Sequence, residues 1–145
     1  MEITYRLHRP NQLQVFNDSA RFVVLVAGRR FGKTTLALVK LITESFSKEN
    51  TRCWYISPSY RQSEMIAWKM LQEMIPPEII IRKDETRLEM MLTGNREIAL
   101  KGADNYDSLR GAGIHMAILD EFALMKPNVW QEIVRPMLTD TLGRA

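Results

Sequence analysis

The sequence predicts an α/β fold in three layers, with a mostly parallel sheet between layers of helices and a β-hairpin inserted in it. Short apolar runs alternate with longer segments whose apolar residues recur at helical spacing. The run at residues 22–27 has no polar interruption, which is typical of a strand buried on both faces. With 145 residues, the chain can form one domain around one core.

The first half of the chain predicts helices and strands in alternation. Pro10 begins a short helix over residues 12–16, and the strand at residues 22–27 follows. Apolar residues at helical spacing predict helices over residues 34–46 and 62–75. Between these helices, residues 52–57 predict a second strand.

The second half begins with a change of period. Apolar and polar residues alternate over residues 88–100 around a turn at residues 93–95, which predicts the hairpin. Residues 104–109 predict a short helix or loop, which the Gly111-Ala112-Gly113 turn ends. A third buried strand is expected at residues 115–119, and then a helix over residues 128–138 that Pro136 interrupts in its last turn.

Composition limits the functional classes. The net charge is +3, and the basic residues gather in residues 1–33, where Glu2 and Asp18 oppose Arg6, Arg9, Arg21, Arg29, Arg30 and Lys33. This cluster suits an anionic ligand without by itself indicating DNA. Cys53 is the single cysteine, so it forms no disulfide within the chain and is expected to be a small core residue. The chain has no zinc-ligand spacing and no apolar segment long enough to span a membrane.

Residues 23–35 have the order of a phosphate-binding loop. An apolar run ends at Gly28, a basic turn leads to Gly32-Lys33-Thr34, and a helical pattern begins. In such a loop, backbone amides surround phosphate oxygens, the lysine contacts the terminal phosphates and the hydroxyl binds Mg2+. Ala27 stands where the strict pattern has its first glycine. The alternative is a tight turn between strand and helix with solvated charges.

A second candidate element follows the strand at residues 115–119. Asp120 and Glu121 stand at its carboxyl end, the edge where open α/β sheets bind ligands. Asp120 could hold Mg2+ next to Thr34, and Glu121 could polarise a water molecule for attack on a γ-phosphate. The alternative is that Asp120 caps a short helix over residues 122–125. Together with the loop, the two carboxylates predict a P-loop NTPase.

The sequence resembles the large terminase subunit of tailed phages at residues 28–34, 107–112, 118–123 and 130–138. This family is an ATP-driven motor that packages viral DNA into a procapsid and also cuts the DNA. The resemblance implies ATP and Mg2+ as cofactors, and double-stranded DNA, the portal, the procapsid and the small terminase subunit as partners. It also implies a homo-oligomeric ring in the full-length form, no membrane, and a location in the host cytoplasm, transiently on the procapsid.

The resemblance implies roles for individual residues. Gln12 stands where the family contacts adenine, Arg29 where it senses or positions the γ-phosphate, and Arg110 where an arginine acts on the nucleotide of a neighbouring subunit. Their alternatives are an exposed polar residue on a helix for Gln12, and a surface arginine paired with Asp107 or another acid for Arg110. The predicted nucleotide-binding set is Gln12, Gly28, Arg29, Arg30, Phe31, Gly32, Lys33, Thr34 and Thr35. The predicted metal ligands are Thr34 and Asp120, and the catalytic residues are Glu121, Arg29 and, in trans, Arg110.

Two family features are missing from the sequence. Residues 139–145 lead towards the strand that bears the family's coupling motif, and no C-terminal nuclease domain follows. We therefore expect residues 1–145 to be a partial P-loop ATPase domain, truncated at its C-terminal end, with little turnover by itself. One alternative is another P-loop motor acting on nucleic acid, such as a helicase. Another is a truncated remnant that binds nucleotide without turnover.

Overall fold

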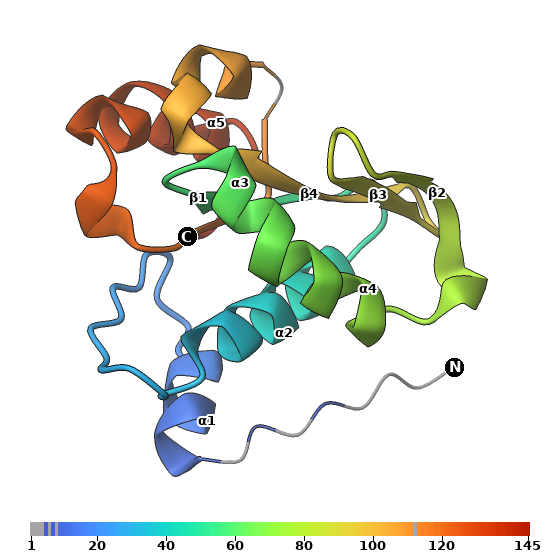
Figure 1. The fold of residues 1–145 in the computed structure, drawn as a ribbon, viewed down its shortest axis with the longest axis horizontal. Coiled ribbons are helices and arrows are strands. Elements are labelled where there is room, and N and C mark those ends of the chain that lie inside the picture. Colours follow the sequence, from blue (N-terminus) through green and yellow to red (C-terminus); the bar gives the residue numbers. More distant parts are fainter. Residues whose placement is uncertain (1–4, 6, 8, 112) are drawn as a thin grey trace.

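The computed structural model describes residues 5, 7, 9–111 and 113–145. Its centre is a five-stranded sheet in the order β2-β3-β4-β1-β5 (Figure 1). β1 runs parallel to both β4 and β5, whereas β3 is antiparallel to both β2 and β4. The carboxyl ends of the three parallel strands therefore meet at one edge of the sheet. The strands are β1 (Arg52–Ser57), β2 (Ile80–Asp84), β3 (Glu89–Leu92), β4 (Arg96–Gly102) and β5 (Met116–Leu119).

Helices lie on both faces of this sheet, which gives three layers (Figure 1). On one face lie α2 (Lys33–Ser45), α3 (Tyr60–Gln62), the π-helix η1 (Ser63–Trp68) and α4 (Lys69–Met74). On the other lie η3 (Ala103–Leu109), the π-helix η5 (Val129–Val134) and α5 (Arg135–Thr139). The remaining helical elements are α1 (Pro10–Phe16), η2 (Pro77–Ile79) and η4 (Phe122–Leu124).

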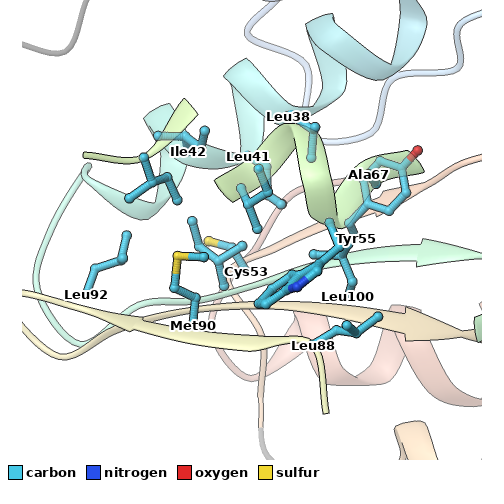
Figure 2. Close-up of a cluster of buried hydrophobic side chains, with 14 of the residues drawn as sticks. Leu38, Leu41, Ile42, Cys53, Tyr55, Ala67, Leu88, Met90, Leu92 and Leu100 are labelled. Carbon is cyan, nitrogen blue, oxygen red and sulfur yellow. The ribbon is translucent and has the colours of Figure 1, made fainter. Parts of the chain in front are cut away.

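The central strand β1 contributes to two hydrophobic clusters, because successive side chains point to opposite faces. Cys53 and Tyr55 belong to the cluster under α2, where they meet Leu38 and Leu41 (Figure 2). Trp54 belongs to the opposite cluster, which η5 and α5 cover. Burial raises the pKa of the Cys53 thiol to about 12, which confirms this cysteine as a small core residue.

Most of the predicted elements are confirmed. The second strand coincides with β1, the third overlaps β5, and the hairpin is formed by β3 and β4. Its turn contains Gly94 and Asn95 at positive φ, as tight hairpin turns require. The predicted helices at residues 12–16, 34–46 and 62–75 correspond to α1, to α2 and to the run from α3 to α4.

The prediction for residues 22–27 is wrong in its burial. This segment is not a strand of the sheet, and Val24 and Val26 are 87% and 93% exposed. At its start, the Val23 amide donates to the Ala145 carbonyl, and the Ala145 amide donates to the carbonyl of the preceding Arg21. Apolar composition favours burial only where another element covers the run, and none covers these valines in the described part of the chain.

Two further findings differ from the sequence-based expectations. β2, an edge strand, was not predicted. The helix at residues 128–138 continues through Pro136. It changes from π to α just before this proline, which has no N–H to donate to the preceding turn. No helix in the described residues is long and apolar enough to cross a membrane. Glu2 and Arg6 of the charged N-terminal region, and Ala112 of the predicted glycine turn, lie outside the described residues.

Candidate functional site

The loop at residues 27–32 joins the segment at residues 22–27 to the N-terminus of α2. Gly32 is the N-cap residue of α2, with φ of 83° in the left-handed region that glycine adopts without strain. A Cβ at this position would lie 2.6 Å from Gln12 Nε2. No side chain of the described residues caps α2, so the amides of its first turn and the positive end of its dipole remain open to an anion.

Lys33 holds its ammonium group over this loop. Its Nζ donates to the Ala27 carbonyl at 2.8 Å and lies 3.5 Å from the Gly28 carbonyl. These acceptors are neutral, and a phosphate oxygen would form a stronger, charge-assisted hydrogen bond with the same ammonium. The contact of Lys33 with a phosphate stays a prediction.

Gln12 connects α1 to the loop. Its side chain is only 5% exposed, accepts a hydrogen bond from the Arg9 amide at 3.3 Å and donates to the Phe31 carbonyl at 2.8 Å. The alternative of an exposed polar residue on a helix is therefore wrong. The Gln12 amide retains a second N–H that could donate to a base, so its contact with adenine stays a prediction.

Asp120, one of the two predicted metal ligands, contacts the hydroxyl group of Tyr55. The Tyr55 hydroxyl donates to Asp120 Oδ2 at 2.6 Å. Burial and this carboxylate raise the pKa of Tyr55, while a hydrogen bond from the Thr34 side chain opposes the rise. The structure thus brings the first turn of α2 and the end of β5 together, as the two motifs predict.

Glu121 follows at the carboxyl end of β5. Its side chain is exposed, and its φ of 50° is unusual for a residue with a Cβ. Its charge contributes to the raised pKa of Tyr55, so it lies in the electrostatic environment of the same site. Asp120 does not cap η4, because Glu121 is the N-cap residue and Asp120 Oδ1 accepts from the Glu121 amide at 3.1 Å. The capping alternative for Asp120 is therefore wrong.

The remaining loop residues differ in exposure. Arg29 and Arg30 are exposed, and Arg30 adopts φ of 64°. Phe31 and Thr35 are half-buried at the end of the loop and the start of α2. Around Gly28, no atom lies within 4 Å of where a Cβ would be, so the loop is open on that side.

Arg110 is not brought to this loop. It follows η3, which packs on the face of the sheet opposite α2, and the two segments lie at opposite sides of the molecule in Figure 1. Its guanidinium lies 4.0 Å from Glu132, and both side chains are more than half exposed. Such a pair contributes little to stability. The side chain of Asp107, the other acid considered for this arginine, lies outside the described part of the chain.

The donor set fits a magnesium ion. Thr34 offers a hydroxyl and Asp120 a carboxylate, and Mg2+ is bound through few protein oxygens together with phosphates and water. The described residues contain no cluster of three or more histidine, cysteine or acidic side chains, which a metal site built from protein ligands alone would need. Thr34 and Asp120 as ligands of Mg2+ stay a prediction.

Sequence reasoning missed Tyr55 as a residue of this site. The pattern at residues 52–57 marks it as a strand residue, and its role depends on the pairing of β1 with β5. Tyr55 is opposite Ile118 in that register, so its side chain shares a face with Asp120, two residues further along. A hydroxyl-bearing aromatic residue near the carboxyl end of a buried strand is the one signal that could have indicated it.

Comparisons with known proteins agree with this geometry. The family model described as "Terminase large subunit, T4likevirus-type, N-terminal" matches residues 24–141. The large terminase subunits of Thermus phage G20c and of Thermus virus P23-45 are each 29% identical over 147 aligned positions, which cover 88% of this chain and 30% of the relative. The chain thus spans about a third of the length of the curated relatives it matches.

A solved structure gives the same result for the fold. The large terminase ATPase domain of Thermus phage P74-26 is 28% identical and superposes with a TM-score of 0.87, over 99% of this chain and 64% of that one. The match includes the loop, β5 and the elements between them. The chain belongs to the terminase large subunit family of the T4likevirus type and corresponds to its N-terminal part.

Proposed function

We propose that this chain binds ATP with Mg2+ and hydrolyses it, and that hydrolysis powers the packaging of viral DNA. The observation that carries the proposal is that α2, whose N-terminus no side chain of the described residues caps, packs in one cluster with β5, after which Asp120 accepts from the Tyr55 hydroxyl. Two separate motifs of the sequence thereby form one site for a phosphate chain and its metal. Family membership favours packaging over another motor on nucleic acid.

In this proposal, residues of the loop bind the phosphates. The amides of the first turn of α2 and the Lys33 ammonium bind the terminal phosphates, and Arg29 carries a further positive charge to the γ-phosphate. Gln12 contacts the adenine through the N–H that does not bind Phe31. Thr34 and Asp120 would hold Mg2+, which when bound would supply positive charge next to the transferred phosphoryl group.

Glu121 is the proposed base. Its carboxylate accepts a hydrogen bond from a water molecule and orients it for in-line attack on the γ-phosphate. The exposed position of Glu121, at the edge of the sheet where β5 ends, supports this role because the carboxylate is accessible to water.

Arg110 is proposed to act on the nucleotide of a neighbouring subunit. Arg110 follows η3, which packs on the face of the sheet opposite α2, and this supports action in trans. A guanidinium supplied by a neighbour would stabilise charge on the γ-phosphoryl group. This role requires a ring of subunits, which is part of the proposal.

The wider assignments are proposals too, because the chain spans only part of its relatives. We propose that residues 1–145 form part of a P-loop ATPase domain. The proposed partners are double-stranded DNA, the portal, the procapsid and the small terminase subunit. The proposed location is the host cytoplasm, with transient attachment to the procapsid.

The test compares binding and turnover in Glu121→Gln, in the gene product that contains this chain. The carboxylate is needed for the chemical step and not for affinity, so ATP binding should be unchanged while phosphate release falls by about 100-fold or more. Glu78→Gln, an exposed acid of η2, is the matched control and should match the parent. Unchanged turnover in Glu121→Gln would rule out Glu121 as the base. A parent that binds ATP without any turnover would instead indicate a nucleotide-binding remnant.

A further inference from the structure

The position of Tyr55 is fixed by the hydrophobic core. Its side chain is 2% exposed and belongs to the cluster formed with Leu38 and Leu41 of α2 (Figure 2). A tyrosine has only two flexible side-chain torsions, and the surrounding side chains leave the ring no alternative position. The phenol oxygen is therefore held at a constant place relative to α2 and the sheet.

The hydroxyl group at the end of this ring orients a carboxylate. The distance of 2.6 Å to Asp120 Oδ2 lies in the range of charge-assisted O–H···O− hydrogen bonds. The other oxygen, Oδ1, accepts from the Glu121 amide at 3.1 Å. With both oxygens engaged, the Asp120 carboxylate has one orientation and still keeps lone pairs for a metal or for metal-bound water.

Tyr55 also connects two elements that are far apart in the sequence. Its ring packs against Leu38 and Leu41 of α2, and its hydroxyl donates to Asp120, which follows β5. The Asp120 carboxylate is thereby held relative to α2, the helix whose first turn contains Thr34.

We propose that Tyr55 is a positioning residue, whose hydroxyl holds the Asp120 carboxylate in the orientation that binds the magnesium ion of the nucleotide. This inference rests on the proposed function of the site. Tyr55 is not itself a ligand. Outer-shell partners of this kind commonly contribute 10- to 100-fold to metal affinity or activity. The competing interpretation is that Tyr55 only fills the core and that its hydroxyl merely satisfies a buried polar group.

The test measures the effect of Tyr55 on metal binding separately from its effect on nucleotide binding. Binding of a fluorescent ADP is measured for the parent chain and for Tyr55→Phe, in EDTA and over a series of Mg2+ concentrations. Tyr55→Phe should leave the affinity in EDTA unchanged, because the loop and Lys33 are intact. The Mg2+ concentration that gives half of the metal-dependent gain in affinity should rise about 10-fold. A purely structural role would not shift this concentration while sparing the affinity in EDTA.

Tyr5→Phe is the matched control. It removes a phenol hydroxyl that donates to the Met74 carbonyl at the end of α4, so the Mg2+ dependence should equal that of the parent. Tyr55→Phe leaves Asp120 without its donor, so thermal unfolding of each variant is measured as well. A second variant, Tyr55→Phe with Asp120→Asn, removes the uncompensated charge. It should show the same Mg2+ dependence as Asp120→Asn alone if Tyr55 acts through Asp120.

Equal Mg2+ dependence in Tyr55→Phe and the parent would overturn the proposal, as would an additional loss in the Asp120→Asn background. A wrong proposed function would give a different result. The parent itself would then not bind ADP, or it would bind ADP with an affinity that Lys33→Ala leaves unchanged.

Discussion

The side-chain amide of Gln12 donates a hydrogen bond of 2.8 Å to the carbonyl of Phe31, and a Cβ at Gly32 would lie 2.6 Å from the same nitrogen. α1 is therefore packed directly on the loop that is proposed to bind phosphate. The space that a side chain at position 32 would need is occupied by a buried glutamine whose two polar atoms are both engaged.

This contact predicts that Gly32→Ala destabilises the chain. Alanine would have to adopt a left-handed backbone and displace Gln12, which we expect to cost about 1–3 kcal/mol in the free energy of unfolding. Gly28→Ala is the matched control, because its Cβ would meet nothing within 4 Å and its φ is not in the positive region that strains alanine. Urea unfolding of both variants measures the difference. Equal loss of stability in the two would contradict the account of this contact.

The exposed segment at residues 22–27 gives a second prediction. Within the described residues, no backbone hydrogen bond holds the amides of residues 24–27, whereas β1 is paired on both sides. In the 145-residue chain, hydrogen exchange at residues 24–27 should therefore be much faster than in β1. Mass spectrometry of exchanged peptides measures both regions in one experiment. Protection of residues 24–27 equal to that of β1 would show that this segment is a paired strand after all.

Local patterns predicted the elements whose own residues carry a strong signal for a strand or a turn. β1 and the β3–β4 hairpin follow from apolar runs, alternation and turn residues. β2 was missed because residues 80–84 combine two isoleucines with three charged residues, a weak pattern for a strand that lies at the sheet edge. The burial of residues 22–27 was predicted wrongly because an apolar run does not indicate which element, if any, covers it.

The residues of the candidate site also fall into those that local sequence patterns predicted and those that they did not. Lys33, Thr34 and Asp120 belong to contiguous motifs whose chemistry can be read from residue types and order. Tyr55 enters the site only through the register in which β1 pairs with β5, and a single sequence does not specify register between distant strands. The burial of Gln12 was also unpredictable, because it depends on how α1 docks on the loop.

Action of Arg110 in trans predicts complementation between two inactive subunits. Arg110→Ala keeps its loop and Lys33→Ala keeps its arginine, so each should be nearly inactive alone. A finger arginine is worth about three to five orders of magnitude in turnover in known cases. When the two are mixed, some interfaces join an intact loop to an intact arginine, so ATPase activity should return in part.

This experiment requires the ring-forming gene product, with assembly confirmed by sedimentation. Partial recovery should depend on the mixing ratio, because the number of complete interfaces does. No recovery at any ratio, with rings present, would count against action in trans.

The central claim, that the loop before α2 binds the phosphates of a nucleotide, is tested most directly by titration calorimetry of Mg2+–ATP into the parent, Lys33→Ala and Lys69→Ala. Lys33 contributes a charge-assisted contact, so its loss should weaken binding by about 10- to 100-fold. Lys69 is an exposed lysine at the start of α4, and Lys69→Ala should bind like the parent. Circular dichroism confirms that all three are folded. Equal affinity of the parent and Lys33→Ala would contradict the claim.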